Sequence, residues 1–78
     1  MREIFRQELA QVGEDLQRMS RLVIEAIENA STALQTADLQ LAEKVIRADE
    51  EIDEIERSLD EQCISLLARQ QPVATDLR

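Results

Sequence analysis

Four acidic side chains at helical spacing are the residues of this chain best suited to chemistry. They lie at positions i, i+4, i+7 and i+11, which places them along one edge of a helix, and together we name them the acidic column: Asp49, Asp53, Glu56 and Asp60. Carboxylates one turn apart can supply oxygen ligands to Mg²⁺, Mn²⁺ or iron, with further ligands from a neighbouring helix and from water. The pattern therefore makes the acidic column a candidate surface site for a hard cation.

The alternative is an ordinary solvated face of an acidic protein. The chain has 17 acidic and 9 basic residues and a formal net charge of -8, and carboxylate pairs one turn apart are common on such helices. Like charges at this spacing repel one another by about 0.2–0.5 kcal/mol per pair, so helix stability alone does not explain the column. The net charge also repels nucleic-acid phosphates and anionic lipid headgroups, so we expect cations or basic proteins as partners and no nucleic acid.

Catalytic groups are scarce in the sequence. It contains no His, Tyr or Trp and a single Gly, so it offers neither a catalytic triad nor a glycine-rich phosphate loop. The lone Cys63 cannot form an internal disulfide, and its place on an apolar stripe predicts a small buried core residue. We detect no signal peptide and no run of about 20 apolar residues. These features predict a cytoplasmic, non-catalytic protein without a membrane span.

Apolar residues in the first half recur at alternating steps of four and three, which predicts a helix over residues 3–34. This seam comprises Phe5, Leu9, Val12, Leu16, Met19, Val23, Ala26, Ala30 and Ala33. Further apolar residues beside it widen the stripe beyond that of a two-stranded coiled coil: Ile4, Leu22, Ile27 and Leu34. A stripe this wide is typical of a helix with two neighbours.

A second helix is predicted over residues 39–69, with Asp38 as its N-cap after a connector at residues 35–38. Its seam comprises Leu41, Val45, Ala48, Ile52, Ile55, Leu59 and Leu66. A short connector between helices of similar length favours an antiparallel hairpin. Because proline lacks an N–H group, we expect Pro72 to end this helix near Arg69, and a third helix to start within residues 73–78.

The width of both stripes has a consequence for assembly. A two-helix hairpin covers only one side of each stripe and leaves a long apolar surface exposed. We therefore expect residues 1–78 to form an incomplete helical domain, either the beginning of a longer protein or a chain that self-associates as a homo-oligomer.

Three segments carry a resemblance to a known family. They are Ala37-Asp-Leu-Gln-Leu-Ala-Glu-Lys-Val-Ile-Arg-Ala-Asp49, Ile52-Asp-Glu-Ile-Glu56 and Arg69-Gln-Gln-Pro-Val-Ala-Thr-Asp-Leu-Arg78. With the long amphipathic helices, they make the chain resemble the amino-terminal part of the PhoU family of bacterial phosphate-uptake and phosphate-signalling regulators. The last segment resembles the corner between the second and third helices of that family.

The resemblance implies an all-α fold in which this chain supplies the first two helices of a three-helix bundle. It also implies a cytoplasmic adaptor between the ATPase of a phosphate transporter and a sensor histidine kinase, which keeps the phosphate-starvation response off when phosphate is ample. Some family members are dimers and bind metal through E/D-x-x-x-D motifs on paired helices. Asp49 and Asp53 match one such motif, which implies Mg, Mn or Fe as a ligand of the full-length protein.

A second function remains open beside this one. The chain could be a structural coiled-coil module that mediates oligomerisation and has no connection with phosphate. The wide stripes and the expected third helix favour the phosphate regulator, because a strict two-position seam and a natural stop after the second helix are what the coiled-coil module requires.

Overall fold

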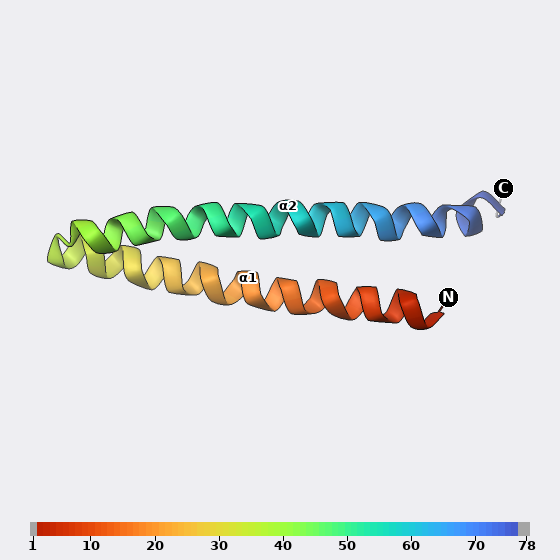
Figure 1. Cartoon of the computed structure of the whole chain (residues 1–78), viewed down its shortest axis with the longest axis horizontal. Coiled ribbons are helices and arrows are strands. Elements are labelled where there is room, and N and C mark those ends of the chain that lie inside the picture. The colour runs from red at the N-terminus through yellow and green to blue at the C-terminus, as the bar shows by residue number, and fades with distance from the viewer. Residues whose placement is uncertain (1, 77–78) are drawn as a thin grey trace.

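Two long antiparallel helices make up the fold (Figure 1). The computed structural model describes residues 2–76, and their side chains as far as Arg69. Helix α1 spans Arg2–Thr36 and helix α2 spans Leu39–Asp76. They lie side by side, with the turn at one end and both termini at the other, in a rod of 59 × 21 × 15 Å (Figure 1). The predicted all-α hairpin is confirmed.

Two residues, Ala37 and Asp38, connect the helices. Helix α1 ends at Thr36 and is therefore longer than the predicted helix over residues 3–34. The N–H of Asp38 donates to the carbonyl of Ala33 at 3.0 Å, and Ala37 has a φ of 54°. A left-handed residue followed by this hydrogen bond is the usual way for a helix to satisfy its last carbonyl groups. The hydroxyl of Thr36 also donates to the carbonyl of Thr32, at 2.8 Å.

Asp38 begins α2 as the sequence predicts. Its Oδ1 accepts a hydrogen bond from the N–H of Leu41 at 3.0 Å, and its carbonyl accepts one from the N–H of Ala42 at 3.0 Å. The side chain thus satisfies one of the free N–H groups of the first turn, which is the role of an N-cap. The turn therefore ends one helix and starts the next within two residues.

The prediction that the second helix ends near Arg69 is wrong, because α2 continues to Asp76. Proline removes one hydrogen bond and costs about 3 kcal/mol inside a helix, but helices can accommodate this loss with a local bend. Of the predicted start of a third helix, residues 73–76 belong to α2, and residues 77–78 lie outside the described residues.

The contact between the helices follows one heptad pattern on each. Alternating steps of three and four connect the inward residues of α1, which are Glu8, Val12, Asp15, Met19, Leu22, Ala26, Asn29 and Ala33, and of α2, which are Leu41, Val45, Ala48, Ile52, Ile55, Leu59, Gln62 and Leu66. All of them are buried or half-buried. The predicted seam of α2 is thereby confirmed, with Gln62 added.

The predicted seam of α1 is only half right. Val12, Met19, Ala26 and Ala33 face α2, but Phe5, Leu9, Leu16 and Val23 are exposed. The apolar arc of α1 is wider than one partner can cover, and the helix is rotated so that Glu8 and Asp15 approach α2. The displaced apolar residues therefore point to the side of the hairpin.

The core is small. It consists of Val12, Ile55, Leu59 and Leu66, with Met19 and Leu22 packed against it. The accessible surface is 6465 Å², whereas a compact protein of 8.9 kDa exposes about 4,800 Å². The radius of gyration is 18.0 Å, against about 11.5 Å for a compact domain of this length. The hairpin covers one strip of each helix and leaves the rest in water.

Candidate functional site

One side of the hairpin carries the apolar residues that the helix contact leaves uncovered. We name it the apolar face, formed by exposed Leu9, Leu16, Val23, Ile27 and Leu34 of α1 and exposed Leu39, Ile46, Cys63 and Leu67 of α2, together with the half-buried Ala30 and Ala42. Near the turn, residues of both helices line a depression of about 540 Å³ that includes Leu34, Leu39 and Ile46. Near the open end, a depression of about 270 Å³ is lined by Phe5, Leu9, Cys63, Leu66 and Leu67.

The acidic column lies on the same face. Steps of three and four along α2 lead from Ala42 and Ile46 through the four carboxylates to Cys63 and Leu67, so all of them share one edge of the helix. The four acidic residues are exposed. The apolar face therefore has an acidic middle on α2 between two apolar ends.

Asp49 and Asp53 can hold a metal only with help from elsewhere. They lie one turn apart on α2, as two ligands of a hard cation require. Over the part of the chain that the structure describes, no group of three or more Asp, Glu, Cys or His side chains is arranged to hold a metal ion. Water or another element must complete the coordination, and the metal site stays a prediction.

Cys63 is exposed, so the prediction of a buried core residue is wrong. It follows Gln62 and therefore lies about 100° around the helix from the contact with α1. The apolar stripe on which the prediction rested is real, but α1 does not cover this part of it.

The opposite side of the hairpin is polar and is held by an ion pair near the open end. Arg69 Nη1 donates to Glu8 Oε1 at 2.7 Å, and Arg69 Nη2 contacts the second carboxylate oxygen. The hydrogen bond and the charge of Arg69 hold the pKa of Glu8 below its ordinary value, and Glu8 raises the pKa of Arg69 in turn. Two parallel bonds give this pair a fixed geometry.

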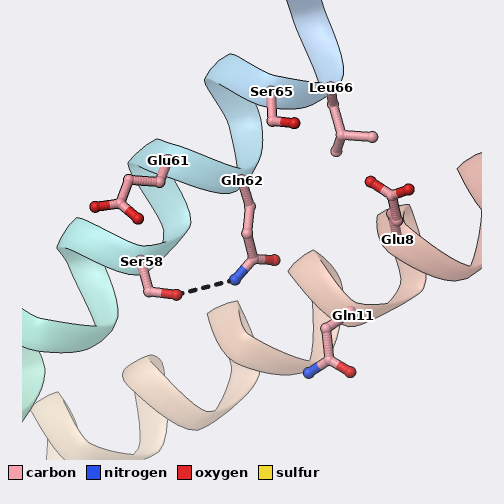
Figure 2. Close-up of a pocket in the computed structure, with 7 residues that line it drawn as sticks. All are labelled: Glu8, Gln11, Ser58, Glu61, Gln62, Ser65 and Leu66. Carbon is pink, nitrogen blue, oxygen red and sulfur yellow. Dashed lines mark hydrogen bonds between the residues drawn. The ribbon is translucent and has the colours of Figure 1, made fainter. Parts of the chain in front are cut away.

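One heptad closer to the turn than the ion pair on each helix, Asp15 accepts a hydrogen bond from Gln62. Gln62 Nε2 donates to Asp15 Oδ2 at 3.1 Å and to Ser58 Oγ at 3.1 Å, the latter bond being drawn in Figure 2. Gln11 Nε2 donates to Asp15 Oδ1 at 3.0 Å. The bonds from Gln62 and Gln11 lower the pKa of Asp15. The two cross-helix contacts fix how the helices are aligned.

Beside this network lies a depression of about 290 Å³ on the polar side. Figure 2 shows Glu8 and Gln11 of α1 on one wall and Ser58, Glu61, Gln62 and Ser65 of α2 on the other. Among these side chains, the Ser58 hydroxyl contacts an amide, which is not a base. The arrangement can stabilise the hairpin but does not resemble a nucleophile with its activating partner.

Sequence reasoning missed the cross-helix pairs. The available signal was the recurrence of polar residues at intervals of seven on both helices, Glu8 and Asp15 on α1 and Gln62 and Arg69 on α2. Charged residues at such positions are easily taken for solvent-facing ones. Arg47 and Glu43, which do face solvent, make a looser i,i+4 pair at 4.0 Å.

Over the residues that the structure describes, neither helix is apolar enough along its length to cross a membrane.

The fold and its two faces define the class of the molecule, an all-α hairpin of the kind that builds helical bundles. Comparison with protein families is specific: residues 16–78 match the model of the PhoU domain. The chain belongs to the PhoU family. No solved structure matches the chain significantly.

Curated relatives agree with this assignment. Over 95% of its length, the chain is 46% identical to the phosphate-specific transport system accessory protein PhoU homolog of Pseudomonas putida and 43% identical to that of Pseudomonas aeruginosa. It is 34% identical to the phosphate-specific transport system accessory protein PhoU of Escherichia coli over the same share. The chain spans 29%, 31% and 31% of the length of these three relatives.

Proposed function

We propose that this chain is part of a non-catalytic regulator of phosphate uptake and of phosphate-starvation signalling. The observation that carries the proposal is its membership of the PhoU family, together with relatives named as accessory proteins of a phosphate-specific transport system. The fold is compatible with this role, because a rod with two chemically different faces is suited to bind other helices and proteins.

The proposed mode of action is that of a cytoplasmic adaptor. The regulator binds the ATPase of the phosphate transporter and a sensor histidine kinase, and holds the starvation response off while phosphate is ample. The acidic surface, with a net charge of -8, supports a role in binding basic protein surfaces rather than anionic ones. The absence of catalysis remains part of the proposal.

The competing function is that of an oligomerisation module without a link to phosphate. The strict heptad pattern of the contact between the helices favours this alternative.

A gene deletion distinguishes the regulatory function from the oligomerisation function. With the gene that encodes this chain deleted, we expect a phosphate-starvation reporter to be active in phosphate-rich medium, and reintroduction of the gene to silence it. A reporter that stays silent after deletion, in cells with normal phosphate uptake, contradicts the regulatory proposal.

We also propose that Asp49 and Asp53 contact a divalent metal, with Mg, Mn or Fe as candidates. Two exposed carboxylates one turn apart support this, as does the agreement of the pair with the E/D-x-x-x-D pattern. At a Mn²⁺ concentration ten times its dissociation constant, binding adds about 1.4 kcal/mol to the free energy of unfolding and raises the melting temperature by about 8 °C.

The test compares thermal melting with and without Mn²⁺. The variant Asp49→Asn with Asp53→Asn should lose the metal-dependent rise, while the matched variant Glu25→Gln with Glu28→Gln on α1 should keep it. If both variants respond to Mn²⁺ as the original chain does, the assignment of the site is wrong.

A further inference from the structure

Helix α1 carries two neighbouring rows of residues, either of which could face α2. Both rows contain Val12, Met19, Ala26 and Ala33. The row in contact with α2 is completed by Glu8, Asp15, Leu22 and Asn29. The neighbouring row, which we name the apolar row, has the next residue in each case: Leu9, Leu16, Val23 and Ala30. Because successive residues of a helix are 100° apart, a rotation of α1 by about 50° exchanges one row for the other.

The observed packing leaves room for the apolar row. A depression of about 270 Å³ borders the helix contact on the apolar face, where Phe5 and Leu9 of α1 approach Leu66 and Leu67 of α2. Leu9 is 52% exposed and Leu16 is 46% exposed. The rotation would turn these side chains toward α2 and remove them from water, which stabilises apolar groups. Apolar burial alone therefore favours the rotated arrangement.

Two polar residues of α2 oppose the rotation. Gln62 and Arg69 lie on the side of α2 that faces α1, and they donate hydrogen bonds to Asp15 and Glu8. Rotation would withdraw both carboxylates and bring leucine side chains of the apolar row toward these donors. A half-buried amide such as that of Gln62 loses more free energy when left without a partner than its hydrogen bond contributes.

We propose that these two cross-helix pairs act as a rotational lock. They hold α1 about 50° away from the orientation that its apolar row favours, and thereby keep that row outside the hairpin. Without the pairs, α1 turns, the depression near the open end closes, and the part of the apolar face on α1 is withdrawn. The four polar residues are thus positioning residues that determine which surface the hairpin presents to other molecules.

Thiol reactivity can measure the orientation of α1. With Cys63→Ser as background, a thiol introduced as Leu16→Cys reports on the apolar row, and one introduced as Leu22→Cys reports on the row that faces α2. Each is reacted with dithiobis(nitrobenzoate) at a concentration where the chain is monomeric. Each rate is divided by the rate in the urea-denatured chain, and circular dichroism confirms that each variant remains helical.

Replacing the two donors on α2 removes the lock. In Gln62→Leu with Arg69→Leu, the Leu16→Cys thiol should react about threefold more slowly and the Leu22→Cys thiol about threefold faster. The matched control Glu50→Leu with Arg57→Leu adds the same side chains at exposed positions on the outer side of α2 and should change neither rate. Rates that stay unchanged without the donors, or that move in the same direction, overturn the proposal, because fraying or compaction affects both thiols alike.

A charge exchange tests the lock without adding apolar side chains, and it decides the matter if Gln62→Leu with Arg69→Leu loses its helical signal. Glu8→Arg places two cations opposite each other and should move the two thiol rates in the same opposite directions. Glu8→Arg with Arg69→Glu restores an ion pair and should return both rates to those of the original chain. A double variant that behaves like Glu8→Arg alone contradicts the rotational lock.

Discussion

At the residue scale, one residue of the turn, Ala37, adopts a backbone conformation that alanine does not favour. Ala37 adopts a φ of 54°, a left-handed conformation that glycine adopts freely but that costs most L-residues about 1–2 kcal/mol, with Asn and Asp as partial exceptions. The neighbouring residue Asp38 has the side chain that its position requires, since it caps α2. Sequence reasoning could find Asp38, because capping residues have a clear preference, but alanine gives no sign of a left-handed position.

The first prediction concerns this alanine. Ala37→Gly should raise the free energy of unfolding by about 1 kcal/mol, because glycine adopts a positive φ without strain. Denaturant unfolding of the chain measures the change. The control is Ala10→Gly in the exposed middle of α1, where the same replacement should lower stability by about 0.5–1 kcal/mol. If both replacements destabilise the chain equally, Ala37 is not strained.

At the scale of the helices, the sequence predicts the inward face of α2 better than that of α1. The seam of α2 is narrow in its middle, because the acidic column interrupts the apolar arc beside Ile52 and Ile55 and leaves only one way to face a partner. On α1 the apolar arc is continuous past Leu16 and Val23, so periodicity alone cannot say which part faces α2. The polar pairs involving Glu8 and Asp15 decide it, and those need both helices in place.

These pairs predict a dependence of stability on pH. The pKa values of Glu8 and Asp15 are lowered in the folded chain. A carboxyl group with a lowered folded pKa stabilises the fold above its unfolded pKa, and this contribution is lost as the pH falls through the folded value. We expect the contribution to be complete at neutral pH, to begin to fall near the unfolded pKa values of about 4, and to be lost once the pH is below the lowered folded values.

A variant separates this effect from the general relief of charge repulsion on acidification. Glu8→Gln with Asp15→Asn should be less stable than the original chain at pH 7, and the difference in the urea midpoint should shrink as the pH is lowered toward 3. A difference that stays constant with pH indicates that the two carboxylates do not titrate with folding.

At the scale of the whole molecule, the sequence was sufficient for the hairpin and for the family, but not for the length of α2. The penalty of Pro72 is local, whereas the continuation of a helix depends on all of its residues, so the proline alone predicted a stop that the structure does not have. The sequence likewise predicts only part of the candidate metal site. Spacing identifies Asp49 and Asp53, but the remaining ligands depend on what lies opposite them.

The exposed apolar face is also a property of the whole hairpin rather than of either helix alone. Neither helix can rotate to bury its whole apolar arc against one partner, so the hairpin holds a small core and leaves a second apolar surface in contact with water. The proposed role in a larger assembly depends on this surface. Its existence is therefore the central claim to test.

Two neighbouring residues provide the most direct measurement. Ala33 is 6% exposed at the helix contact, whereas Leu34 is 85% exposed on the apolar face. With Cys63→Ser as background, Ala33→Cys and Leu34→Cys can be reacted with dithiobis(nitrobenzoate) at a concentration where the chain is monomeric. The Leu34→Cys thiol should react as fast as in the urea-denatured chain, and the Ala33→Cys thiol at least about tenfold more slowly. Equal rates in the folded chain would contradict the account.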